Sequence, residues 1–168
     1  MKKLSTRSCE EIMTTVYKPI EFVIDGLLAQ GLYILAGAPK VGKSWLALDM
    51  CLSIAKGEKI LGLKTSQGTA LYLCLEDSYA RIQNRLYELT DEPTEMLYFS
   101  VMSDPIGGGL EEQIESFKIE HCGLKIVFID TLQMVRSDTD SSYGSDYKEL
   151  SVLKALADKL EIAIIVVH

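Results

Sequence analysis

The stretch GAPKVGKS at residues 37–44 constrains this chain more than any other feature, because it matches G-x-x-x-x-G-K-[ST] between two runs of different pattern. Residues 32–36, LYILA, are a short apolar run of the kind that forms a buried parallel strand. Residues 45–52 carry large apolar side chains in a helix-forming stretch. A strand, a glycine-containing turn and a helix in this order predict a phosphate-binding P-loop.

The residue types in this loop suit a triphosphate. Gly37 and Gly42 permit backbone angles and a close approach that a side chain would block, and a helix beginning at about Gly42 would point its positive end at the phosphates. Lys43 is expected to neutralise charge between the β- and γ-phosphates, and Ser44 to place its hydroxyl on Mg²⁺. The predicted ligands are therefore ATP and Mg²⁺. The residues expected to bind the nucleotide are Gly37, Ala38, Pro39, Lys40, Val41, Gly42, Lys43, Ser44 and Trp45.

Composition and charge bound the class of protein. The 168 residues are 48% hydrophobic with a mean hydropathy of +0.14, which suits one globular domain with a sizeable core. A net charge of −7 argues against nucleic-acid binding by bulk electrostatics in this segment, although a local basic loop or one outside the segment stays open. No stretch is as long as a membrane span and the amino end lacks the apolar block of a signal peptide, so we expect a soluble cytoplasmic protein without a membrane partner. The four cysteines are widely spaced, which favours reduced thiols.

The rest of the chain alternates strand and helix patterns. Apolar runs at residues 69–75, 97–102, 124–129 and 162–167 predict strands, and the segments between them predict helices that include 110–121 and 147–160. With the P-loop strand these elements predict an α/β fold of three layers around a mostly parallel sheet. Residues 1–17 are either a leader or a short helix capped by Ser8, and residues 18–168 are the predicted core.

Acidic residues follow two of these strands. Asp130 comes after a run of apolar residues, the position at which P-loop proteins place a carboxylate that holds Mg²⁺ through its water shell. Glu76 and Asp77 follow the strand at 69–75. Ligands bind at the carboxyl edge of open parallel sheets, so these carboxylates are candidate site residues. Residues 136–146, rich in Ser, Asp, Thr and Gly, predict an exposed mobile loop.

Three stretches together resemble the RecA-like ATPases of the AAA_25 and RepA-type replicative helicase group. They are residues 31–44, residues 73–78 leading to Arg81 and Arg85, and the closing Val166-Val167-His168. The resemblance runs from about Lys18 to the end of the chain. It implies a core strand order of 3-2-4-5-1, counted from the P-loop strand, and an origin on phages, plasmids or integrated elements.

The same resemblance implies roles for individual residues. Glu76 would polarise the attacking water, with Asp77 as the alternative, and His168 would sense the γ-phosphate. Glu76, Asp130 and His168 would converge on that phosphate, and Lys43 would join Glu76 and His168 in catalysis. In the family the chain continues into basic segments that bind DNA, so we expect this chain to be incomplete after His168, with DNA bound by regions beyond it. The whole protein is expected to be a homo-oligomeric ring of six or another number of subunits.

Two functions remain open at this point. The first is an ATP-hydrolysing domain of a helicase or related DNA-processing ATPase. The second is a small-molecule phosphotransferase or a regulatory nucleotide-binding module. A kinase needs a basic segment that closes over its acceptor, whereas the predicted loop at 136–146 carries Asp138, Asp140 and Asp146. Arg81 and Arg85 are interpreted as solvated charges of a helix rather than as contacts to a neighbouring subunit.

Overall fold

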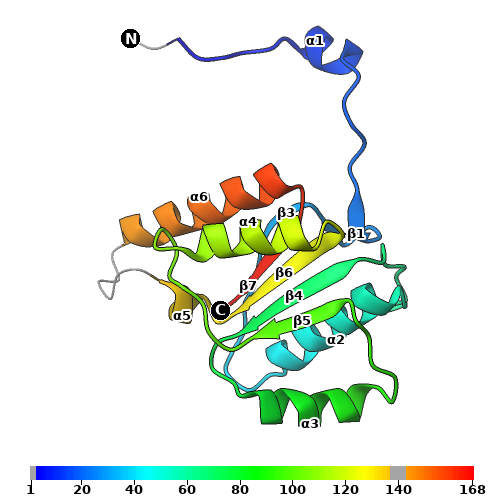
Figure 1. Cartoon of the computed structure of the whole chain (residues 1–168). Coiled ribbons are helices and arrows are strands. Elements are labelled where there is room, and N and C mark those ends of the chain that lie inside the picture. Colours follow the sequence, from blue (N-terminus) through cyan, green and yellow to red (C-terminus); the bar gives the residue numbers. More distant parts are fainter. Residues whose placement is uncertain (1–2, 137–142) are drawn as a thin grey trace.

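A parallel sheet of five strands forms the centre of the molecule in a computed structural model, which describes residues 3–136 and 143–168 (Figure 1). The strands lie in the order β3-β7-β6-β4-β5, and every neighbouring pair is parallel. Counted from the P-loop strand, this is the predicted order 3-2-4-5-1, which is thereby confirmed. The bounds are β3 Gly31–Leu35, β4 Thr69–Cys74, β5 Leu97–Ser100, β6 Leu124–Asp130 and β7 Ala163–Val167.

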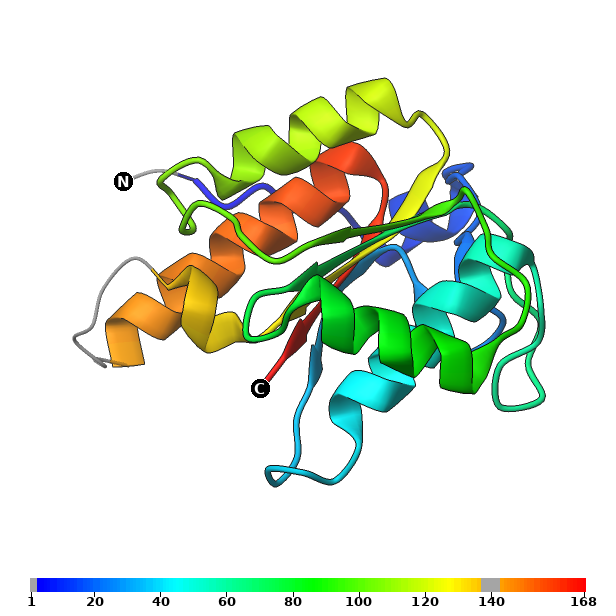
Figure 2. The ribbon, with the colours of Figure 1, turned by 60° about the horizontal axis from the view of Figure 1, so that its bottom comes forward.

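Helices cover both faces of this sheet, giving the predicted three layers (Figures 1 and 2). One face carries α2 (Lys43–Lys56) and α3 (Tyr79–Leu89), and the other carries α4 (Leu110–Glu120) and α6 (Tyr143–Leu160). Successive side chains of a strand point to opposite faces. Ala70, Tyr72 and Cys74 of β4 accordingly pack in the cluster that includes α2, whereas Leu71 and Leu73 pack in the cluster that includes α4 and α6.

The P-loop strand is less buried than its composition predicted. In the sheet β3 is an edge strand, paired only with β7 among the described residues, and Ile34 is 53% exposed. The apolar run therefore identified the strand correctly, but it did not reveal that the strand lies at the edge of the sheet.

Two elements near the amino end were not specified by the sequence pattern. These are β1 (Phe22–Ile24) and β2 (Leu28–Ala29), which form an antiparallel hairpin across the break at Asp25-Gly26.

The helix α1 (Cys9–Thr14) is capped by Ser8, whose side chain accepts from the Glu11 N–H at 3.0 Å, and it buries no residue. Figure 1 shows α1 standing apart from the sheet and its covering helices.

The predicted exposed loop at 136–146 needs correction at its carboxyl end and at Arg136. A short helix, α5 (Leu132–Val135), precedes it, and α6 begins at Tyr143 rather than at Tyr147. Arg136 is not a solvated loop residue, because it forms an ion pair with Glu149 of α6 at 3.4 Å, and Glu149 is buried. The middle of the predicted loop, residues 137–142, lies outside the described residues.

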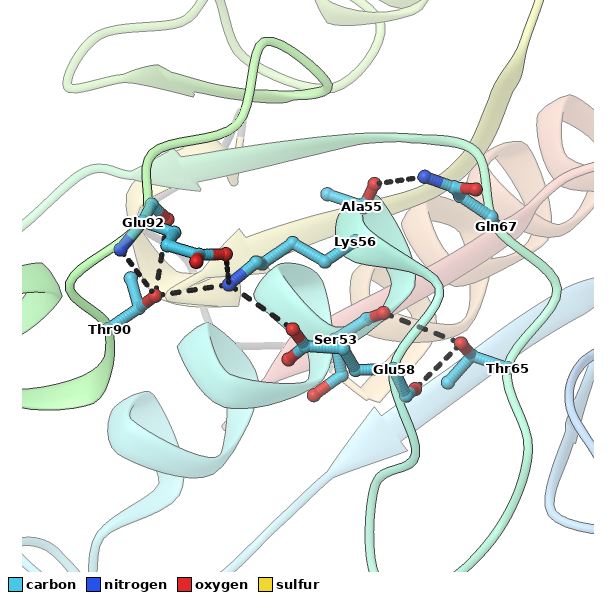
Figure 3. A network of polar contacts seen from close by, with 8 residues as sticks. All are labelled: Ser53, Ala55, Lys56, Glu58, Thr65, Gln67, Thr90 and Glu92. Atoms are coloured by element: carbon cyan, nitrogen blue, oxygen red, sulfur yellow. Dashed lines mark hydrogen bonds and ion pairs between the residues drawn. The ribbon is translucent and has the colours of Figure 1, made fainter.

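A polar network fastens the end of α2 that lies away from the P-loop (Figure 3). The Lys56 Nζ donates to the Thr90 hydroxyl at 3.1 Å and pairs with the carboxylates of Glu58 at 3.2 Å and Glu92 at 4.0 Å. The Lys56 side chain is only 14% exposed. Thr65 and Gln67 add bonds to backbone carbonyls near the same helix end. The network joins α2 to the segment that follows α3, which fixes two helices of one layer.

Replacing Lys56 by alanine is expected to lower the free energy of unfolding by about 1 kcal/mol, mainly through the lost bond to Thr90. The glutamate partners are largely exposed and contribute little. Chemical denaturation measures the change. The control is Lys154→Ala, which removes an exposed ion pair with Asp158 and should change stability by less than about 0.5 kcal/mol. Equal losses in the two variants would contradict a structural role for the network.

None of the helices in residues 3–136 and 143–168 combines the length and the apolar character needed to cross a membrane.

Candidate functional site

The register of the sheet brings the predicted site residues to one edge. Leu35 pairs with Val167, Val167 with Asp130, and Asp130 with Cys74, so four strands end side by side. The segments that leave these ends are the P-loop, His168, Thr131 and the Glu76-Asp77 pair. Elements far apart in the sequence therefore meet at the carboxyl edge, where open parallel sheets bind their ligands.

Of the two P-loop glycines, Gly42 has a backbone conformation that requires glycine, whereas Gly37 has no positive φ and a Cβ there would make contacts of 3.4 Å or more. Gly42 has φ 96° and ψ 14° and directly precedes α2, which begins at Lys43. This left-handed conformation is strained for a residue with a Cβ, so the second fixed glycine of the motif is required by the turn itself. Lys40 also has a positive φ, of 63°. Residues 36–41 are exposed, which leaves the loop accessible to a ligand.

Lys43 folds back over the loop. Its Nζ donates to the carbonyl oxygens of Gly37 at 2.6 Å and Ala38 at 2.9 Å. A lysine ammonium has three donors, so these two bonds leave one N–H free. An anion could therefore take the place of the two carbonyl oxygens. The ammonium thus lies beside the first two residues of the loop.

Ser44 and Asp130 are in direct contact although 86 residues separate them. The Ser44 hydroxyl donates to Asp130 Oδ2 at 2.6 Å, and the Tyr72 hydroxyl donates to the same oxygen at 2.8 Å. Burial raises the pKa of the Tyr72 hydroxyl well above its usual range, and the Asp130 carboxylate beside it raises the pKa further, so this hydroxyl stays protonated as a donor. Three elements, α2, β4 and β6, are joined through one carboxylate oxygen.

These oxygens fit Mg²⁺. The cation prefers oxygen ligands, keeps several of its waters and takes only one or two protein ligands beside substrate phosphates. A serine hydroxyl in contact with a partly exposed carboxylate, at the amino end of a helix, offers that donor set. No group of three or more His, Cys, Asp or Glu side chains suited to a metal occurs in the described part of the chain, so a metal caged wholly by protein is not indicated there. Ser44 and Asp130 are the residues that would hold Mg²⁺ here.

The two acidic residues after β4 have different surroundings. Asp77 forms an ion pair with Arg85 at 2.6 Å, and its Oδ1 also accepts the Ser78 N–H at 2.9 Å. Arg85 in turn lies over the ring of Trp45, 5.7 Å from the centroid. The carboxylate of Glu76 is exposed and has no hydrogen bond or ion pair within the residues that the structure describes. Asp77 is therefore held in place by two partners, whereas Glu76 has none among the described residues.

The interpretation of Arg85 as a solvated helix charge was wrong. Its side chain is 29% exposed, contacts Trp45 in the first turn of α2, and pairs with Asp77 in the segment between β4 and α3. A sequence signal existed, since Arg85 lies two helical turns beyond the acidic pair, but nothing local indicated the tryptophan. Arg81 is exposed and lines one small cavity together with Asp77 and Arg85.

A cavity of about 150 Å³ lies between these groups. Its walls are almost all polar, in contrast to a larger cavity of about 380 Å³ that lies away from this edge, at the start of β5. The smaller cavity is lined by Ser44, Tyr72, Cys74, Glu76, Asp77, Arg81, Arg85 and Asp130. Glu76 and Asp130 therefore line the same cavity.

His168 lies at the same edge but outside this lining. Its backbone N–H donates to the Leu35 carbonyl at 2.9 Å, which continues the pairing of β7 with β3 toward the P-loop. Its side chain is exposed. The sequence placed His168 correctly at a strand end, and it gave no indication of Tyr72, which pattern reading assigns simply to a buried strand.

Comparisons with known proteins agree with this architecture. The family model AAA_25, described as an AAA domain, matches residues 8–168. DNA repair protein RadA of Helicobacter pylori is 28% identical over 165 residues, which are 94% of this chain and 33% of that protein. DNA repair protein XRCC3 of Mus musculus is 33% identical over 85 residues, which are 46% of this chain and 23% of that protein. The chain thus spans a third or less of the length of these relatives.

Among solved structures, one described as an ATPase domain superposes on the chain with a TM-score of 0.61, covering 82% of this chain and 56% of that one. Its sequence identity is 15%, so the likeness concerns the fold. The family model accounts for every residue after the first seven. The chain is therefore a RecA-like P-loop domain that belongs to the AAA_25 family of AAA domains.

Proposed function

We propose that this domain, with residues 18–168 as its core, binds ATP with Mg²⁺ and hydrolyses it. The observation that carries the proposal is the 2.6 Å contact between the Ser44 hydroxyl and Asp130 at the amino end of α2. The contact supports the proposal because it joins the serine of the P-loop motif to the strand-end aspartate, the two residues expected to hold Mg²⁺. ATP is the nucleotide chosen because the AAA_25 family and the solved ATPase domain of the same fold both point to it.

In this proposal the loop from Gly37 to Trp45 surrounds the phosphates. Backbone N–H groups and the amino end of α2 face the negative charge, and Lys43 exchanges its two carbonyl partners for phosphate oxygens. Ser44 and Asp130 would hold Mg²⁺, which would neutralise charge on the phosphate oxygens when bound.

Glu76 is proposed as the general base. The water oxygen forms a bond to the γ-phosphorus, the bond from that phosphorus to the β,γ-bridging oxygen breaks, and its electron pair stays on ADP. The water gives its proton to the Glu76 carboxylate. Asp77 is the weaker candidate, because its carboxylate already forms an ion pair with the Arg85 guanidinium at 2.6 Å. His168, at the end of β7, is proposed to sense the γ-phosphate.

A helicase-type or related motor that acts on DNA is the proposed context. The two relatives are named as DNA repair proteins, which supports DNA as the partner. A net charge of −7 opposes phosphate contacts, so the DNA contacts are proposed to lie outside residues 1–168. The whole protein is proposed to be a cytoplasmic homo-oligomeric ring, encoded by a mobile element as the resemblance implied.

The test uses the single tryptophan of the chain, Trp45, which directly follows Ser44. ATP with Mg²⁺ should change its fluorescence in a saturable way, and single-stranded DNA should raise the hydrolysis rate of the intact protein several-fold. Failure to bind ATP would overturn the proposal. Binding and hydrolysis of ATP without any response to DNA would support the proposed ATPase activity but contradict the proposed action on DNA. Tight, salt-sensitive DNA binding by residues 1–168 would contradict the placement of the DNA contacts.

A further inference from the structure

Tyr72 is a core residue whose hydroxyl reaches the candidate metal site. It lies on β4, its side chain is 2% exposed, and it packs with the residues under α2. Its ring centroid lies 5.8 Å from that of Phe128 and 6.2 Å from that of Phe99. These neighbours hold the ring from both adjacent strands, so the position of the hydroxyl is fixed by packing.

The oxygen that receives this hydroxyl belongs to Asp130. The terminal torsion of an aspartate side chain is broad, so a carboxylate needs hydrogen bonds to hold one orientation. Here Oδ2 accepts from Tyr72 at 2.8 Å and from Ser44 at 2.6 Å. Two donors on one oxygen set the plane of the carboxylate and leave Oδ1 without a hydrogen bond among the described residues.

The two donors are not equivalent. The Ser44 hydroxyl sits on a short side chain that rotates, and binding a cation through its oxygen constrains the direction of its proton. The Tyr72 hydroxyl lies on a rigid ring and is also 3.3 Å from the Ser44 carbonyl oxygen. Only the tyrosine keeps its place whatever Ser44 binds.

We propose that Tyr72 is a positioning residue for Mg²⁺, which orients the Asp130 carboxylate so that it receives the cation's water together with Ser44. This inference rests on the proposed function, since it concerns the metal of the ATP site. Groups that hydrogen-bond a metal-binding side chain commonly change metal affinity by about 10- to 100-fold when removed.

The test is Tyr72→Phe, which keeps the ring and removes the hydroxyl. The probe is the β,γ-imido analogue of ATP, which separates binding from turnover, and Trp45 fluorescence reports its binding. The Mg²⁺ concentration at half-saturation should rise about tenfold, whereas the affinity for the analogue in EDTA should stay unchanged. The melting temperature should fall by only a few degrees, because one hydrogen bond is lost while the packing around the ring is retained.

Two further variants separate positioning from a general structural effect. Tyr33→Phe is the matched control, since it removes a half-buried hydroxyl that accepts the Ala29 N–H at 3.1 Å. Tyr33 does not line the cavity at the carboxyl edge of the sheet, so this change should not shift the Mg²⁺ midpoint. In a cycle with Asp130→Asn, adding Tyr72→Phe should cause little further loss, because the hydroxyl acts through the carboxylate. Additive losses would contradict that path.

The outcomes distinguish this inference from the proposed function. A parental protein that binds the analogue with Mg²⁺, together with a Tyr72→Phe variant of the same Mg²⁺ midpoint, overturns the role of Tyr72 alone. Equal losses with Mg²⁺ and in EDTA make Tyr72 a structural residue and also overturn it. A parental protein whose affinity for the analogue does not respond to Mg²⁺ overturns both.

Discussion

Replacing Glu76 by glutamine is expected to lower the rate of ATP hydrolysis by about a hundredfold or more while ATP affinity stays the same. A general base acts on the attacking water and has no contact with the ground-state nucleotide, so its removal changes turnover rather than binding. Glutamine keeps the size of the side chain and removes only its ability to take a proton. The rate should be measured on the intact protein with DNA present, where turnover is fast enough for a decrease to be resolved.

The surroundings of the two carboxylates supply the physical reason. Asp77 lies between the Arg85 guanidinium, which contacts its Oδ2, and the Ser78 N–H, which donates to its Oδ1. Both oxygens of this carboxylate therefore already have a partner within the domain. Glu76 borders the same cavity as Asp130 and has no such partner among the described residues.

Asp77→Asn is the informative comparison for this prediction. It should loosen the contact of Arg85 with Trp45, because the ion pair that holds the arginine is lost. Its effect on turnover should be smaller than that of Glu76→Gln. If Glu76→Gln hydrolyses ATP at the parental rate and Asp77→Asn does not, the base is Asp77. If both retain full activity, the RecA-like mechanism assigned to this site is wrong.

The fold was largely readable from the sequence because its signals are local. Each strand of the sheet is an apolar run of a few residues, and the helices between them show helical spacing, so the order of elements followed directly. The order of strands within the sheet came from resemblance, since no local pattern states which strands pair. The hairpin of β1 and β2 escaped because strands of three and two residues are too short to show alternation.

The site was readable only in part, for a related reason. The motif residues Lys43 and Ser44 and the strand-end Asp130 follow from spacing. The contacts of Tyr72 with Asp130 and of Arg85 with Trp45 do not, because they join residues 58 and 40 positions apart through the packing of separate elements. A buried tyrosine in an apolar strand reads as core, and its hydroxyl becomes informative only when the neighbouring strand end is placed beside it.

Replacing Lys43 by alanine should weaken the affinity for ATP by about a hundredfold or more, which corresponds to about 2.7 kcal/mol. In the free protein the ammonium donates to two neutral carbonyls, Gly37 at 2.6 Å and Ala38 at 2.9 Å. A bond from the ammonium to a neutral carbonyl oxygen lacks the attraction between opposite full charges that a bond to a phosphate oxygen gains. The exchange of carbonyl for phosphate oxygens therefore favours binding, and the alanine variant cannot make it.

Lys40→Ala is the matched control for Lys43, because it removes the same charge from the same loop and keeps the backbone N–H, the group through which Lys40 is expected to bind the phosphates. Lys40 is exposed and occupies a variable position of the motif, so ATP affinity should fall by less than about threefold, the scale of a screened surface charge. Titration of both variants, followed by Trp45 fluorescence, separates a placed contact from general electrostatic attraction. Similar losses in the two variants would mean that the loop attracts ATP only by its charge. Parental affinity in Lys43→Ala would refute the P-loop assignment, because no other side chain of the described residues donates to the Gly37 and Ala38 carbonyls.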